Sequence, residues 1–280
     1  MYLPLAYIAY PHLDPVIMRM GPLALRWYGM AYVLGFLLAY LGLRRLVQNG
    51  RLRISPDQLT DLLSWLIAGV LLGGRLGWWL VYHRSGGQPE DWYEPLALWR
   101  GGMSFHGALA GMAIVLAAWS WRRRAPLWNI ADSLALVAPV GLLLGRIANF
   151  INAELVGRPT NMPWGVIFPG ETIARHPSEI YEALLEGPLL LAAIWAAQKW
   201  ARLRDGRTAA LFVILYGVLR FAVEFTRQPD LELGFIAFGW LTMGQLLSAV
   251  LVVIGGALEI TFRGGPNQSL RPDRAATHLA

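Results

Sequence analysis

A cluster of charged and amide side chains occupies residues 145–160, directly after the apolar run 130–144. Arg146, Asn149 and Asn152 recur there at helical spacing, so a guanidinium and two carboxamides would lie along one face of a helix. An arginine in hydrocarbon costs at least about 2.5 kcal/mol on insertion scales, so this position needs a compensating interaction. Convergent donors of this kind suit an anionic headgroup.

A second polar stripe, formed by Tyr216, Arg220 and Glu224, recurs every four residues in another apolar run. Side chains at this interval drift only slowly around one face of a helix. Together with the arginine of the first cluster, Arg220 could hold a phosphate through planar, multidentate hydrogen bonds. Glu154 and Glu224 would hold the two guanidinium groups in position. The pattern predicts a binding site for a lipid phosphate.

The elements that must position these residues are membrane-spanning helices. Hydrophobic residues make up 56% of the 280, charged residues 15%, and the mean hydropathy is +0.43. Apolar stretches of about 20 residues predict an all-α polytopic fold with seven spans. We place the spans at about 23–43, 59–82, 104–121, 130–150, 179–198, 209–226 and 236–258. Residues 1–262 would form a single transmembrane catalytic domain, and residues 263–280 a poorly ordered tail.

The basic residues predict the orientation of the chain. One set of predicted loops carries fourteen Lys and Arg residues, whereas the opposite set carries seven, several of them among acidic residues. By the positive-inside rule, the N-terminus lies outside and the C-terminus inside. The outer loops, mainly 83–103 and 151–178, would cap the site. The net charge of +6 then comes mostly from the basic loop residues that set the orientation of the chain in the membrane. It does not indicate a nucleic-acid partner.

This orientation places the unusual polar residues of six predicted spans at one level, near the outer surface, as a shared site requires. These residues are Tyr28, Arg75, His106, Arg146, Asn149, Ser178, Glu179, Glu182, Arg220 and Glu224. By contrast, the inner halves of three spans are almost wholly apolar.

Several kinds of chemistry are excluded or not indicated. The chain contains no cysteine, which excludes disulfides, thiolate metal sites and an enzyme-borne thiol nucleophile. No metal site or cofactor motif is present. The first ten residues lack a basic leader and precede Pro11, so we expect an interfacial segment rather than a cleaved signal peptide.

Some of these residues also have a structural interpretation. Arg75 either binds lipid or extends to the outer interface, and the sequence does not favour one over the other. Glu182 and Glu186 are interpreted as structural partners of Arg75. Four glycines are expected to permit close helix packing, namely Gly107, Gly111, Gly141 and Gly145.

Five motifs, in order along the chain, resemble those of the bacterial prolipoprotein diacylglyceryl transferases. They are Arg26-Trp27-Tyr28-Gly29, Ser104-Phe105-His106-Gly107, the stretch 145–157, His176-Pro177-Ser178-Glu179-Ile180-Tyr181-Glu182, and the stretch 220–230. Two departures, Ala148 and Ala108, stand where glycine is common in that family, and both keep a small side chain.

The resemblance implies a multi-pass enzyme of the bacterial inner membrane, with a periplasmic N-terminus and a cytoplasmic C-terminus. Such an enzyme moves the diacylglyceryl group of phosphatidylglycerol to the lipobox cysteine of a prolipoprotein signal peptide. It releases glycerol phosphate, uses no cofactor, and acts at the periplasmic face. The resemblance also implies that Arg146 and Arg220 are essential. It assigns to the site Tyr28, His106, Asn149, Glu154, Gly157, Tyr216 and Glu224. No oligomer is required.

The thiolate is the nucleophile in such a reaction, so a base must take the thiol proton. His106 is our candidate because its side chain titrates near neutrality and would lie at the outer entrance of its helix. Glu224, Tyr28 and water remain alternatives.

Two other classes of protein remain open. A lipid transporter or flippase could also need intramembrane arginines, but the apolar inner halves of the spans and the absence of an internal repeat argue against alternating access. A non-catalytic scaffold would explain neither Arg146 nor Arg220.

Overall fold

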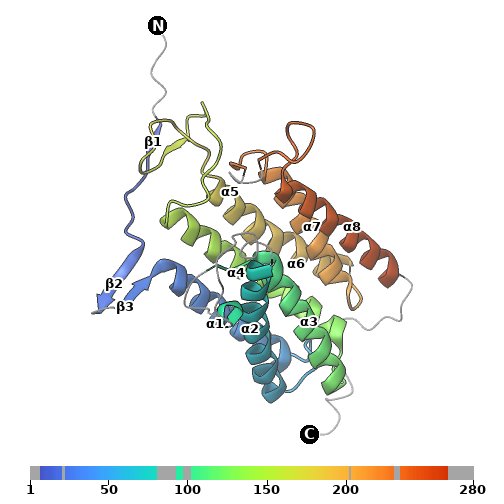
Figure 1. The fold of residues 1–280 in the computed structure, drawn as a ribbon. Helices are drawn as coiled ribbons and strands as arrows, with labels where there is room; N and C mark the ends of the chain where they lie inside the picture. Colours follow the sequence, from blue (N-terminus) through green and yellow to red (C-terminus); the bar gives the residue numbers. More distant parts are fainter. Residues whose placement is uncertain are drawn as a thin grey trace. The chain divides into compact units, whose positions relative to one another are not determined.

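The structure is a computed structural model that describes residues 7–20, 23–80, 93–96, 102–201, 203–229 and 234–263. Within these ranges the chain is mostly helical (Figure 1). The helices are α1 (Trp27–Gln48), α2 (Pro56–Trp78), η2 (Glu94–Leu96), α3 (Phe105–Arg123), α4 (Leu127–Ile151), α5 (Ser178–Leu184), η4 (Leu185–Leu189), α6 (Leu190–Ala201), α7 (Arg207–Val223) and α8 (Met243–Arg263). The strands are β1 (Ile8–Ala9), β2 (Val16–Met20), β3 (Leu23–Arg26) and β4 (Val166–Ile167).

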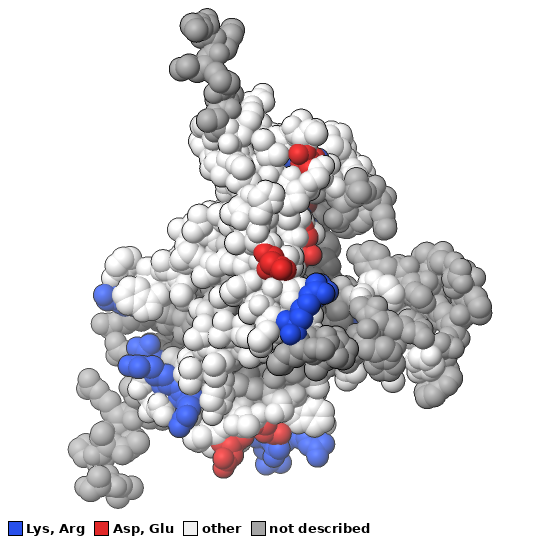
Figure 2. Space-filling view, turned by 90° about the vertical axis from the view of Figure 1, so that its left-hand side faces the viewer, with Lys and Arg blue, Asp and Glu red and all other residues white. Residues whose placement is uncertain are grey.

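Each of the seven predicted spans overlaps a described helix, or in one case the continuous series α5–η4–α6. Five of these helical segments are long and apolar enough to cross a membrane: α1, α2, α4, Ser178–Ala201 and α8. The chain is therefore an all-α membrane protein in outline. Figure 2 shows one face on which charged side chains form a few small groups and the remaining described surface is uncharged.

Two predicted span boundaries are wrong. Residues 23–26 form strand β3, which pairs with β2 in an antiparallel hairpin, so helix α1 begins only at Trp27. The last helix begins at Met243 instead of residue 236, because residues 237–241 form a turn. Hydropathy alone does not distinguish an apolar hairpin or turn from the start of a helix. Residues 81–92 and the tail after residue 263 lie outside the described ranges. The predictions made for these residues therefore stay predictions.

The chain divides into two compact units. Of the described residues, the first comprises those up to residue 43 and those from 131 to 263, and the second comprises those from 44 to 130. In the second unit, Ser55 and Gln58 form a capping box at the start of α2, with Pro56 at the first helical position. These signals fix where α2 begins.

Helices α2 and α3 of the second unit pack through glycines. A Cβ added to Gly73 would lie 2.8 Å from the Cα of Gly111, and one added to Gly77 would lie 2.6 Å from the Cα of Gly107. The predicted packing role of Gly107 and Gly111 is therefore confirmed. The prediction is wrong for Gly145, where an added Cβ would meet nothing within 4 Å. At Gly141 an added Cβ would also meet nothing within 4 Å. A Cβ added to Gly35, however, would lie 3.6 Å from the Cα of Gly141, so the backbone of α4 is near α1 at this point.

In the first unit, helices α7 and α8 approach closely at two glycines. A Cβ on Gly217 would lie 2.8 Å from the carbonyl oxygen of Ser248, and one on Gly255 would lie 2.7 Å from a side-chain carbon of Ile214. Asp132 of α4 is buried and accepts hydrogen bonds from the backbone N–H groups of Gly206 and Ala209, at 2.7 and 2.8 Å. It thereby satisfies donors at the start of α7, which has no side-chain cap of its own.

The loop between α4 and α5 folds back on the segment that follows α7. We call residues 155–158, 174–178 and 226–228 the loop clasp. Its strand-like hydrogen bonds join Gly157 N to His176 O at 3.0 Å and Arg158 N to Thr226 O at 2.8 Å. Burial lowers the pKa of His176, which favours the neutral ring at neutral pH.

Strand β1 pairs in parallel with β4 beside the loop clasp, and their side chains pack with those of α4. Tyr10 and Phe168 form a small core with Phe150. Burial, and the nearby charge of Glu179, raise the pKa of the Tyr10 hydroxyl. That hydroxyl therefore stays protonated and donates to the carbonyls of Phe150 and Ile151, at 2.9 and 2.8 Å.

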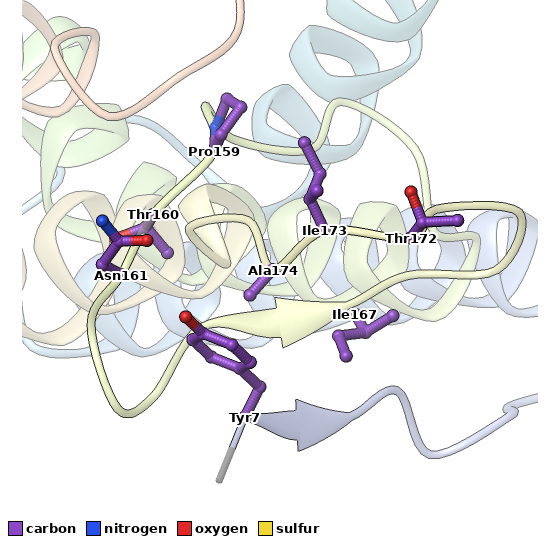
Figure 3. A pocket seen from close by; sticks show the side chains of 8 residues that line it. All are labelled: Tyr7, Pro159, Thr160, Asn161, Ile167, Thr172, Ile173 and Ala174. Atoms are coloured by element: carbon purple, nitrogen blue, oxygen red, sulfur yellow. The ribbon is translucent and has the colours of Figure 1, made fainter. Parts of the chain in front are cut away.

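An open pocket of about 350 Å³ lies beside this small sheet (Figure 3). Its lining includes Tyr7, Thr160, Asn161, Ile167 and Thr172. None of the residues that line it is a predicted site residue.

Candidate functional site: a buried arginine–glutamate cluster

Three arginines and three glutamates of the first unit meet in one buried group, which we call the arginine–glutamate cluster. Its members are Arg146 of α4, Glu182 of α5, Glu186 of η4, Arg220 of α7, and Glu224 and Arg227 directly after α7. They come from three segments that are far apart in the sequence. The cluster therefore exists only in the folded chain.

Glu182 links all three arginines. Its carboxylate oxygens lie 2.8 Å from Nη1 of Arg146, 3.5 Å from Nη1 of Arg220 and 3.3 Å from Nη1 of Arg227. Glu186 adds contacts of 3.3 Å to Nε of Arg146 and 3.9 Å to Nε of Arg220. The two glutamates thus hold the two predicted phosphate-binding arginines side by side.

Glu182 and Glu186 face the same arginines, and they are four residues apart, an interval that keeps two side chains on one face of a helix. Residues Leu185–Leu189 form a π-helical turn, with Pro188 inside it, between α5 and α6. Proline has no N–H to donate to the helix, and π turns occur frequently at functional sites.

The carboxylates lie deeper than the arginines. The side chains of Glu182 and Glu186 are 1% and 0% exposed, whereas those of Arg146, Arg220 and Arg227 are 17%, 13% and 12% exposed. The glutamates therefore support the guanidinium groups from the protein interior. The arginines are thus the more exposed members of the cluster.

Glu224 is held from two sides, because Nη2 of Arg220 lies 2.8 Å away and the hydroxyl of Thr242 donates to it at 3.0 Å. Thr242 and Gln245 exchange side-chain and backbone hydrogen bonds in a capping-box pattern at the start of α8. The predicted contact between Glu224 and Arg220 is confirmed. The start of α8 thus takes part in orienting the cluster.

Tyr216 lies one turn before Arg220 in α7 and is buried. Its ring stacks on Phe212 with centroids 6.0 Å apart, and its hydroxyl lies close enough to Glu186 and Arg146 for their charges to act on it. The predicted stripe of Tyr216, Arg220 and Glu224 therefore borders the cluster.

The two asparagines and Glu154 form a second group at the end of α4. The side-chain amides of Asn149 and Asn152 donate to the same oxygen of Glu154, at 2.7 and 3.4 Å. The prediction that Glu154 orients Arg146 is wrong within the described residues, where Arg146 pairs with Glu182 and Glu186 instead. The chain turns after Ile151 and directs Glu154 back onto the amides.

Gly157 lies where three backbone segments of the loop clasp cross. A Cβ at this position would lie 2.7 Å from the carbonyl oxygen of Thr226 and equally close to the side chain of His176. The structure therefore explains the glycine by close backbone approach. The substrate-binding role predicted for Gly157 stays a prediction.

The remaining predicted site residues lie on α1, α2 and α3. Tyr28 of α1 belongs to the first unit, and its hydroxyl lies 3.4 Å from that of Tyr32. Arg75 of α2 belongs to the second unit, is buried, and donates to the carbonyl of Gly102 at 3.4 Å with its guanidinium over the ring of Trp78. His106, also of the second unit, is in the first turn of α3, and its side chain lies outside the described part of the structure.

Comparison with known sequences provides the family. A sequence model of the family described as "Prolipoprotein diacylglyceryl transferase" matches residues 15–261. The chain belongs to this family.

Its relatives include proteins named phosphatidylglycerol--prolipoprotein diacylglyceryl transferase from several bacteria. The Sinorhizobium medicae protein is 45% identical over 260 residues, which cover 90% of this chain and 92% of the relative. A Nitratidesulfovibrio vulgaris protein is 46% identical over 266 residues, 92% of this chain and 97% of the relative. The Bordetella bronchiseptica protein is 44% identical over 259 residues, 90% of this chain and 97% of the relative.

In this diacylglyceryl transferase family member, sequence reasoning missed the partners of the arginines. Glu182 and Glu186 were interpreted as partners of Arg75, and no partner was predicted for Arg227. A signal was present, because Glu179, Glu182 and Glu186 recur at intervals of three and four residues within one apolar helix. Such a line of acids requires cations on neighbouring helices.

We expect Glu182→Gln to destabilise the protein, because the neutral amide leaves three buried guanidinium groups with too little compensating charge. Losing one partner of a buried ion pair costs about 3–5 kcal/mol. The midpoint of thermal unfolding in detergent should fall by roughly 5 °C or more.

Glu171→Gln is the matched control, since Glu171 pairs with Arg175 at a more exposed position and should matter little. Equal midpoints for the two variants would show that the cluster does not stabilise the fold.

Proposed function

We propose that this chain transfers the diacylglyceryl group of phosphatidylglycerol to the lipobox cysteine thiol of prolipoproteins. The product is a thioether, glycerol phosphate is released, and the reaction is the first step of lipoprotein maturation. The single observation that carries the proposal is the pair Arg146 and Arg220, held side by side by buried carboxylates. The names and the 44–46% identity of the relatives point to the same reaction.

The cluster supports a phosphate site by its charge and its exposure. A guanidinium presents five N–H donors in a plane, and two such groups can hold a phosphate through several bonds at once. Within the described residues, Nη1 of Arg220 is buried and has a 3.5 Å ion-pair contact with Glu182 but no hydrogen bond, so its hydrogen-bonding capacity is not fully used. Because the carboxylates hold the guanidinium groups in place beforehand, little reorganisation is needed when charge develops.

The proposed reaction forms a carbon–sulfur bond and breaks a carbon–oxygen bond. The thiolate attacks the diacylglyceryl carbon that is bonded to the phosphate oxygen, and the electron pair of the broken bond leaves on that oxygen. The phosphate therefore gains negative charge as the bond breaks, and Arg146 and Arg220 stabilise it. Glycerol phosphate is a competent leaving group, so the mechanism uses no cofactor.

The thiol proton goes to His106 in this proposal, with Glu224, Tyr28 or water as alternatives. His106 lies in the first turn of α3, at the N-terminal end of that helix. Asn149 and Glu154, with Tyr216 nearby, would line the headgroup site, and Arg75 would contact lipid.

The expected product can be detected directly on a lipobox peptide in phosphatidylglycerol liposomes. Mass spectrometry should show a diacylglyceryl adduct on a peptide with Cys and none on the same peptide with Ser. Arg146→Ala and Arg220→Ala should each lower the rate by about 10²–10³-fold, because each removes a charge-stabilising donor.

Arg263→Ala is the control for this experiment, because its side chain is 70% exposed at the end of α8. It should keep the wild-type rate. A well-folded wild type that forms no adduct would contradict the proposed function.

His106→Asn tests the proton acceptor. If His106 is the base, the variant should lose most of its activity, and its residual rate should rise with pH as the free thiol ionises. Full activity across a series from pH 6 to 9 would move the role to another group.

We also propose the finer membrane arrangement. The chain spans the bacterial inner membrane seven times as one catalytic body of residues 1–262, with the N-terminus periplasmic, the C-terminus cytoplasmic and the site on the periplasmic side. A monomer suffices. The asymmetry of basic residues supports this orientation.

The absence of native cysteine allows a direct test of the orientation. In intact spheroplasts, a membrane-impermeant maleimide should label Asn161→Cys, in the loop between α4 and α5. The matched variant Asn49→Cys, after α1, should react only once the membrane is permeabilised. The reverse pattern would invert the topology.

A further inference from the structure

The carboxylate of Glu224 lies directly against the first turn of α8. A Cβ added to Gly244, the second residue of that helix, would lie 2.5 Å from Oε1 of Glu224 and 2.7 Å from its Cδ. A side chain at position 244 would therefore displace the carboxylate. At Gly256 of the same helix an added Cβ would meet nothing within 4 Å. The close approach of a charged group thus explains the glycine at position 244 and does not explain the one at position 256.

Both oxygens of this carboxylate have partners on opposite sides. Oε1 accepts a hydrogen bond of 3.0 Å from the hydroxyl of Thr242, two residues before Gly244, and Oε2 lies 2.8 Å from Nη2 of Arg220. The N-terminal end of a helix carries partial positive charge, which favours a carboxylate beside it. The start of α8 therefore holds Glu224, and Glu224 in turn holds Arg220.

The packing of α7 on α8 keeps the first turn of α8 close to this ion pair. One turn further along α8, the hydroxyl of Ser248 donates to the carbonyl of Gly244 at 2.7 Å. The carbonyl oxygen of Ser248 would lie only 2.8 Å from a Cβ on Gly217, which is three residues before Arg220 in α7. The two backbones are in close contact there, so the flexible carboxylate would yield to a side chain at position 244 more readily than the helix would.

We propose that Gly244 and Thr242 are positioning residues for Arg220, which they orient through Glu224. This inference rests on the proposed function and deepens it, since it names residues that contact no substrate but set the geometry of a phosphate-stabilising arginine. Gly244 leaves the space that the carboxylate occupies, and the Thr242 hydroxyl fixes its orientation. Arg220 then presents its guanidinium in one orientation as charge develops on the phosphate.

The first test is Gly244→Ala, with Gly256→Ala as the matched control on the same helix. Gly244→Ala should lower kcat for diacylglyceryl transfer by about 10–100-fold, because a small misplacement of a charge-stabilising group has effects of this size. Its KM for phosphatidylglycerol should change by less than about 3-fold, as expected when the lost interaction belongs to the transition state. Gly256→Ala should keep the wild-type kcat and KM. Thermal unfolding in detergent gives the folded fraction to which each rate is referred.

The hydroxyl of Thr242 is tested by a conservative pair of variants. Thr242→Val should lower kcat by about 3–10-fold, the effect of one lost hydrogen bond. Thr242→Ser keeps the hydroxyl and should restore the wild-type kcat. If Thr242→Ser is as slow as Thr242→Val, the hydrogen bond to Glu224 is not what matters and the role of Thr242 is wrong.

A double substitution tests whether Gly244 acts through Glu224. In Glu224→Ala the carboxylate that Gly244 accommodates is gone, so adding Gly244→Ala should slow the reaction by less than about 2-fold further. A further loss as large as that in the wild-type background would show that Gly244 acts by another route and would overturn the inference. Equal kcat values for Gly244→Ala and Gly256→Ala would overturn it as well. If the well-folded wild type transfers nothing, the proposed function itself fails, and this inference fails with it.

Discussion

A guanidinium buried in an apolar interior needs an opposite charge within reach, and the first unit is organised around that requirement. Arg146 and Arg220 come from α4 and α7, and their charges are met by Glu182 and Glu186 on the segment between. Transferring these ions from water costs several kcal/mol each, so the pairs add little to stability by themselves. Their effect is to fix which faces of three helices meet.

The same pairs prepare the arginines for a ligand. Glu182 and Glu186 are more deeply buried than the guanidinium groups with which they pair, so a phosphate would meet the arginines before these two carboxylates. The loop clasp and the Thr242–Gln245 cap hold Arg227 and Glu224 at the border of this group. The arginines are therefore already oriented by these contacts, as electrostatic stabilisation of a transition state requires. None of the residues that line the open pocket beside β4 belongs to the arginine–glutamate cluster.

The helical regions and the importance of Arg146 and Arg220 to a shared polar cluster could be predicted from the sequence, because apolar length and isolated charges are local signals. The pairing of Arg220 with Glu224 followed from helical spacing. The partners of Arg146 did not, because they lie 36 and 40 residues away on another helical segment, and the sequence does not show which segments pack together. Hydropathy also could not show that residues 23–26 form a strand, since a short apolar strand and the start of a helix look alike.

A structure of the protein with bound phosphatidylglycerol would test the central claim most directly. The account predicts the lipid phosphate at hydrogen-bond distance from the guanidinium groups of both Arg146 and Arg220, with Glu182 and Glu186 still paired with them. A phosphate bound elsewhere, with the two arginines bonded only to their glutamates, would contradict it. In that case the cluster would be a structural ion-pair network, and the transporter interpretation would have to be considered again.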